Sequence, residues 1–283
     1  MSTFEQAIRF TTDSAGMERS LRLVQAAVQI LSSFALPFDL LLVALGAAAG
    51  PAPAAPAVRG VLAALNQRLG LARRYFRLFR FLEAFDGAQK ALAQLTAPSS
   101  PADVAWLDVL ARTFNGMYLL LEASTVVDAL QVPGLALWGP ERERRVTVEA
   151  QRFWLLALAC GGLAALARIP AALALAAVPA TPAGLAPLAD APTGEKDGEK
   201  EKEKETAESK EALRRRERPN VRAKVHKLGR TALASAIDIV LPGSVIGWIS
   251  ADPGTVAVAM FVTSILTGMD VWERCGREVA AGK

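Results

Sequence analysis

Residues 71–85 read LARRYFRLFRFLEAF, a segment in which arginines are set among aromatic and aliphatic side chains. An α-helix turns by about 100° per residue, so this segment collects apolar side chains on one stripe and guanidinium groups on the opposite side. The apolar stripe consists of Leu71, Tyr75, Leu78, Leu82 and Phe85, with Phe81 at its edge. The cationic side consists of Arg73, Arg77 and Arg80, with Arg74 at the boundary.

A helix with this division can lie flat in a bilayer interface, because its rings enter the acyl layer while its arginines meet lipid phosphates. We therefore predict that these ten residues bind an anionic phospholipid membrane. The alternative is a surface helix whose apolar stripe packs on its own domain, which is the more common use of amphipathic helices. Phe76 and Phe79 fall near the arginine side and require a second contact, such as a neighbouring helix or another protomer.

The composition favours contact with lipid. Hydrophobic residues make up 52% of the 283 residues, and the mean hydropathy is +0.27. Charged residues are concentrated in a few blocks, so long stretches carry almost no charge. The net charge of +4 is too small to indicate a nucleic-acid partner, and we expect none.

The pattern predicts an all-α, membrane-associated protein with amphipathic helices, one to three transmembrane helices and a disordered charged linker. We expect five regions: an amphipathic helical region 1–132 with the interface helix 66–90, a polar connection 133–152, an apolar membrane helix 153–178, a disordered Pro/Ala and Glu/Lys linker 179–218, and a basic segment with the carboxyl-terminal membrane region 219–283. We also expect Ser14 to cap the first long helix and a single helix from Val58 to Leu95.

Nothing in the sequence assembles a catalytic site. The single histidine, His226, lies in a basic segment without a carboxylate or cysteine partner, and Cys160 and Cys275 lack metal-ligand spacing. Asp238 and Asp270, which flank apolar stretches, are expected at helix ends near water; the alternatives are a polar pathway and an oligomer contact. We therefore expect no enzyme, no cofactor and no metal.

Three segments resemble the peroxin-11 family of the peroxisomal membrane, in a fungal-type version. Residues 16–25, GMERSLRLVQ, are similar to its amino-terminal pattern G-R-D-K-x-x-R-x-x-Q-Y, and residues 73–83, RRYFRLFRFLE, to its R-K-x-x-R-x-G-K-x-x-E segment. The region from Asp238 to Trp272 resembles its glycine-rich terminal hydrophobic part. Phe79 departs from the family pattern, which usually has glycine at that position.

The resemblance implies a location in the peroxisomal membrane and a role in remodelling and elongating that membrane, which promotes peroxisome proliferation and fission. It also implies self-association into homo-oligomers and work with the fission machinery, a dynamin-related GTPase and its membrane adaptor. Apolar side chains inserted into one leaflet expand that leaflet and favour positive curvature, which is the mechanism we expect.

Two alternatives stay open. One is a membrane channel for small metabolites that uses Arg168, Asp238 and Asp270, although the apolar segments carry few regularly spaced polar groups. The other is a soluble helical scaffold in which the apolar stretches are buried. Basic residues flank both the 153–169 stretch and the tail, so the orientation of the spans is not fixed by charge.

Overall fold

The computed structural model describes residues 3–49, 54–96, 102–177 and 221–282, and the predicted linker 179–218 lies outside them. The described residues form α-helices and no strand, which confirms the all-α class. The chain forms two compact units. One consists of Met1–Ala164 with Thr231–Lys283, and the other of Ala165–Arg230.

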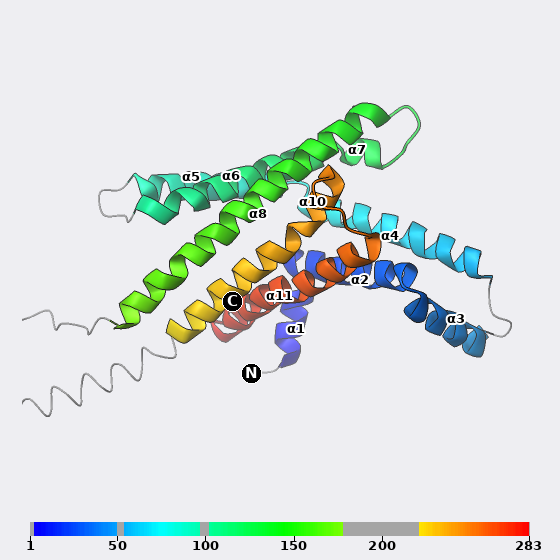
Figure 1. Cartoon of the computed structure of the whole chain (residues 1–283), viewed down its shortest axis with the longest axis horizontal. Helices are drawn as coiled ribbons and strands as arrows, with labels where there is room; N and C mark the ends of the chain where they lie inside the picture. Colours follow the sequence, from blue (N-terminus) through cyan, green and yellow to red (C-terminus); the bar gives the residue numbers. More distant parts are fainter. Residues whose placement is uncertain (1–2, 50–53, 97–101, 178–220, 283) are drawn as a thin grey trace, which may run out of the picture. The chain divides into compact units, whose positions relative to one another are not determined.

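Figure 1 labels the helices of the described residues. They are α1 Thr3–Thr12, α2 Ser14–Ser33, α3 Ala35–Ala49, α4 Ala55–Arg77, α5 Arg80–Leu95, α6 Ala102–Ser124, α7 Val126–Ala129, α8 Pro140–Ala177, α10 Val240–Ile246 and α11 Pro253–Ala280. A further helix covers 221–238.

Helix α2 is central to the first unit, where it packs against both α4 and α11. It begins after Asp13, whose carboxylate accepts hydrogen bonds from the N–H groups of Ala15 and Gly16 at 3.1 and 3.0 Å. The cap is therefore Asp13 rather than the predicted Ser14, because a carboxylate one residue earlier reaches the free N–H groups of the first turn. Helix α2 then bends by 96° into α3.

Two apolar clusters hold α2 in place. Ala26 packs with Leu241, Ala259 and Met260, which brings α10 and α11 against one side of α2. The other cluster joins α2 to α3 and α4 and consists of Val28, Phe38, Val58 and Leu62. The small side chain of Ala26, which is fully buried, permits close approach of the helices there.

The predicted helix from Val58 to Leu95 is divided in the structure. Helix α4 ends at Arg77 and α5 begins at Arg80, with Phe79 at φ −106° and ψ 6° between them. At the break, the N–H of Leu78 bonds the carbonyl of Tyr75 at 3.2 Å, a tighter spacing than an α-helix uses. The change of direction lets α5 pair with α6, and the two lie side by side in Figure 1.

Within the described ranges, three helices are long and apolar enough to cross a membrane: Pro140–Ala174, Val221–Ile246 and Pro253–Ala280. The bent pair α2 and α3 is a fourth candidate if the two helices count as one span. Helix α8 begins at Pro140, so the second half of the predicted polar connection 133–152 is helical and continuous with the apolar stretch. The loop before α8 covers residues 130–139, and the charged run 141–145 forms the first turns of the helix.

Candidate functional site

The arginine side of α4 faces α2. The Nε and Nη2 atoms of Arg73 donate to Oε1 of Glu18 at 3.1 and 3.0 Å, and Nη1 donates to Gln25 at 2.7 Å. The side chains of Arg73 and Glu18 are only 11% and 2% exposed. A guanidinium bonded in this way to a buried carboxylate has little surface left for a lipid phosphate.

Arg77 continues this charged contact one turn further along α4 and binds α6. Its Nη2 donates to Glu122 at 2.8 Å and its Nη1 to the hydroxyl of Tyr118 at 3.1 Å. The Tyr118 hydroxyl in turn donates to the same Glu122 oxygen at 3.0 Å. Burial raises the pKa of Tyr118 to about 12, so the phenol keeps the proton that it donates.

A third buried network joins α2 to the carboxyl-terminal helices. Arg22 donates to Asp238 and, at 3.1 Å, to the hydroxyl of Thr263, which itself donates to Asp238 at 2.6 Å. Asp238 is 5% exposed, so the expectation that it lies near water is wrong. Its carboxylate is stable there because a guanidinium and a hydroxyl both bind it.

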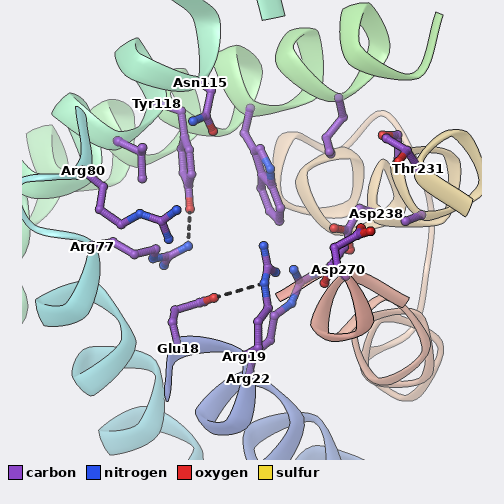
Figure 2. Close-up of a pocket in the computed structure, with 16 residues that line it drawn as sticks. Glu18, Arg19, Arg22, Arg77, Arg80, Asn115, Tyr118, Thr231, Asp238 and Asp270 are labelled. Atoms are coloured by element: carbon purple, nitrogen blue, oxygen red, sulfur yellow. Dashed lines mark hydrogen bonds and ion pairs between the residues drawn. The ribbon is translucent and has the colours of Figure 1, made fainter. Parts of the chain in front are cut away.

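These networks surround a cavity of about 270 Å³ in the first unit. Figure 2 shows Arg19 and Arg22 rising from α2 into the space below Tyr118 and Asn115, with Asp238 and Asp270 beside it. Arg77 and Arg80 enter from the side opposite Asp238 and Asp270. The site is therefore polar and rich in guanidinium groups, although candidate membrane spans supply part of its wall.

The outer face of α4 and the first turn of α5 carry exposed apolar side chains. Along this face the exposed fractions are 46% for Tyr75, 69% for Phe79 and 59% for Leu82. Val61 and Leu65 continue the same row toward the start of α4, at 66% and 42% exposed. Val61, Leu65 and Tyr75 recur at helical spacing on α4, Phe79 lies at the break, and Leu82 is in the first turn of α5. These five exposed side chains are called the α4–α5 edge.

The ten predicted residues thus divide between this edge and the interior. Tyr75 and Leu82 lie outward, whereas Arg73 and Arg77 bind carboxylates inside the unit. The other six are half-buried: Leu71, Arg74, Leu78, Arg80, Phe81 and Phe85. Phe81 packs on the cluster of Tyr118, Leu119 and Ala150, and Phe85 lies against Gly116. Arg80 pairs with Glu83 at 3.7 Å. Whether these residues bind a membrane stays a prediction.

A family model supplies the identity. The model for peroxisomal biogenesis factor 11 (PEX11) matches residues 43–272, which includes α4, α5 and the three candidate spans almost completely. The chain belongs to the PEX11 family. The protein is therefore a peroxisomal biogenesis factor, and the match confirms the resemblance found in the sequence. The PEX11 family is not a known enzyme family. No curated protein and no solved structure matches the chain.

The matched range of this PEX11-family chain bears on the motifs. The segment 73–83 and the region from Asp238 to Trp272 lie inside the match, whereas the amino-terminal pattern at 16–25 lies before it. Sequence reasoning missed Phe79 as an outward residue. Phe79 lies at the break between α4 and α5, so its exposure depends on a break that the sequence analysis did not predict.

Proposed function

We propose that this PEX11-family protein remodels and elongates the peroxisomal membrane, and thereby promotes peroxisome proliferation and fission. The observation that carries the proposal is the outward apolar edge of α4 and α5, defined by Val61, Leu65, Tyr75, Phe79 and Leu82. Exposed apolar rows of this length on one side of a helix are typical of surfaces that meet lipid or another protein.

The opposite side of α4 explains how such an edge would act as a wedge. Arg73 and Arg77 fix α4 to α2 and α6 through buried carboxylates, so the edge is held by the fold. Burying a large apolar side chain contributes about 1.5–3 kcal/mol, so a few rings and leucines are enough to hold the edge in one leaflet. Expansion of that leaflet then favours positive curvature.

Lipid phosphates remain partners for the basic residues that flank the edge. Arg68 is exposed and Arg74 is half-buried on α4, and Arg80 keeps 37% of its side chain exposed. Each cation near an anionic surface contributes about 1 kcal/mol. This set replaces Arg73 and Arg77 as the headgroup contacts in the proposal.

If copies of the protein associate with one another, their separate effects on membrane curvature would add up along a tubule. The exposed row of α11, formed by Val258, Val262, Ile265 and Met269, gives the candidate span an apolar surface for lipid or for a second copy. We include homo-oligomers, and contact with a dynamin-related GTPase and its membrane adaptor, as parts of the same proposal.

The proposal is tested with the full-length protein reconstituted into vesicles that contain anionic phospholipid. Electron microscopy should show tubules with the wild type and spherical vesicles with the double variant Phe79→Gln/Leu82→Gln, because two apolar anchors are lost. The matched control is Leu135→Gln/Leu137→Gln, which removes two exposed leucines (53% and 65%) from the loop before α8 and should leave tubules. Tubules that persist in the α4–α5 variant would overturn the mechanism.

A channel for small metabolites is the second candidate. It is favoured by Arg22, Asp238 and Asp270, which line one cavity and include two carboxylates on candidate spans. Ionisable groups within spans commonly mark solute pathways. Single-channel conductance in planar bilayers that changes in Asp270→Asn would support this function, and bilayers that stay silent would exclude it.

A further inference from the structure

The loop between α7 and α8, residues 130–139, exposes apolar side chains where a loop normally exposes polar ones. It reads LQVPGLALWG and carries no charge. Leu135 and Leu137 are 53% and 65% exposed, and Val132 and Trp138 are exposed as well. Figure 1 shows the loop projecting beside α7. Contiguous apolar surface of this kind is typical of a site that a partner covers.

Hydrogen bonds give this loop a fixed shape. Oδ1 of Asp128 accepts from the N–H groups of Trp138 and Gly139, both at 2.9 Å. The indole Nε1 of Trp138 donates to the carbonyl of Ser124 at 3.1 Å. These bonds tie the end of the loop to α6 and α7, so the apolar side chains keep one arrangement. A surface that is already ordered loses less conformational entropy when it binds.

The start of α8 separates the loop from lipid. Seven charged residues fall within 141–152, and the next charge after Arg152 is Arg168. Where α8 crosses a bilayer, the hydrocarbon therefore begins after Arg152, and the helix from Pro140 to Arg152 extends about 20 Å beyond it. A tilt of about 40° still leaves about 15 Å, whereas the headgroup layer is only about 5–8 Å thick on each side. The loop then lies outside the bilayer, which favours a protein as its cover.

Arginines next to the loop indicate the charge of that protein. Arg145 pairs with Glu141 at 2.6 Å. Arg142 and Arg144 are exposed and form no ion pair with a carboxylate of the described residues. Glu143, the other carboxylate of these turns, is half-buried and lines a separate cavity. Two guanidinium groups therefore remain for carboxylates of a partner.

We propose that the loop 130–139 and the first turns of α8 dock a segment of another protein that carries apolar side chains next to carboxylates. Its apolar side chains cover Leu135 and Leu137, and its carboxylates pair with Arg142 and Arg144. An apolar centre with a charged rim is the usual anatomy of a protein interface. The proposal does not rest on membrane remodelling, because none of these residues belongs to the α4–α5 edge.

The test places the photo-cross-linking amino acid benzoylphenylalanine at Val132 of the full-length protein in isolated peroxisomes. Irradiation should give an adduct with a different protein, and the cross-linked peptide should contain Asp or Glu beside apolar residues. The same group at Leu163, which is 55% exposed in the apolar part of α8, should give lipid adducts. Lipid adducts at Val132, adducts confined to this chain or its copies, or no adduct would overturn the proposal.

Variants show whether the adduct depends on the proposed surface. Leu135→Gln/Leu137→Gln should lower its yield about tenfold, because two apolar anchors are lost. Arg142→Glu and Arg144→Glu should each lower it about fivefold, because an attraction becomes a repulsion. The matched control is Arg277→Glu, an exposed arginine near the end of α11, which should give the wild-type yield. A yield that survives the loop and arginine variants, or that falls equally in Arg277→Glu, would overturn the assignment.

The outcome is separate from membrane remodelling. Vesicles with purified protein contain no partner, so Leu135→Gln/Leu137→Gln should form tubules there while it loses the adduct in peroxisomes. A failure of remodelling in every form of the protein would leave the cross-linking result unaffected. Loss of the adduct with tubules retained assigns the loop to docking and the α4–α5 edge to the membrane.

Discussion

Arg73 and Glu18 form the charged contact that fixes α4 against α2. Both side chains are nearly buried, and the guanidinium donates two hydrogen bonds to one carboxylate oxygen. A buried ion pair adds little net stability compared with apolar residues, but the loss of one partner leaves an uncompensated charge. The pair therefore acts mainly on position, because α4 cannot leave α2 without separating the two charges.

We predict that Arg73→Met destabilises the protein by about 3–5 kcal/mol, because Glu18 is left buried without its main partner. Thermal unfolding in micelles, followed by circular dichroism, measures the loss. The double variant Arg73→Met/Glu18→Leu should recover most of it. Lys90→Met breaks a pair with Asp86 whose side chains are 71% and 57% exposed, and should change stability by less than about 1 kcal/mol. Equal losses at the two sites would contradict the buried role of Arg73.

Tyr118 makes stability depend on pH in the alkaline range. Its pKa in the fold is about 12, above the ordinary value of 10.0, because burial disfavours the phenolate. The folded state holds the proton more tightly than the unfolded state, so this contribution is complete below pH 10.0 and is lost as pH rises toward 12. Tyr118→Phe should abolish this part of the alkaline loss in unfolding experiments. An unchanged alkaline profile in the variant would contradict the assignment.

At the scale of elements, the contact between α5 and α6 depends on Gly116. A β-carbon added there would lie 2.7 Å from the ring of Phe85, too close for any real contact. Phe85 therefore packs directly on the α6 backbone and helps to hold α5 against α6.

Gly116→Ala should consequently destabilise the protein, by about 1–3 kcal/mol, because the Phe85 ring must move in a packed contact. Gly60→Ala is the matched control: a β-carbon at residue 60 of α4 meets nothing within 4 Å, and alanine favours the helix by about 1 kcal/mol. The two changes should shift the unfolding temperature in opposite directions. A stabilising Gly116→Ala would contradict the packing of α5 on α6.

The sequence predicted most helices because their apolar periodicity is local. It did not predict the break at Leu78. The contacts on either side of the break join segments far apart in the sequence: Arg77 binds Glu122, and Phe85 meets Gly116, 31 positions away. The sequence also did not predict that Arg73 points inward, because its partner Glu18 lies on a helix far away in the chain. An amphipathic pattern shows that two faces differ, and tertiary partners decide which face is outward.

At the scale of the whole molecule, the described residues carry many exposed large apolar side chains, on the candidate spans as well as on the α4–α5 edge. A soluble scaffold would bury such residues, so this surface disfavours that alternative. The family match agrees with this surface, because it identifies a peroxisomal biogenesis factor and the exposed apolar side chains include those of the candidate spans. The short motifs predicted the family from the sequence: one lies in α2, one at the junction of α4 and α5, and one in the carboxyl-terminal helices. The last two lie inside the family match.

The most direct test of the central claim is the depth of Phe79 in a reconstituted membrane. Phe79→Cys, labelled with an environment-sensitive fluorophore in a Cys160→Ser/Cys275→Ser background, reports whether the α4–α5 edge enters lipid. We predict a blue-shifted emission that quenchers on the acyl chains suppress, while a label at residue 142 stays in water. Emission from residue 79 that is typical of water, with no quenching from the acyl chains, would contradict the account.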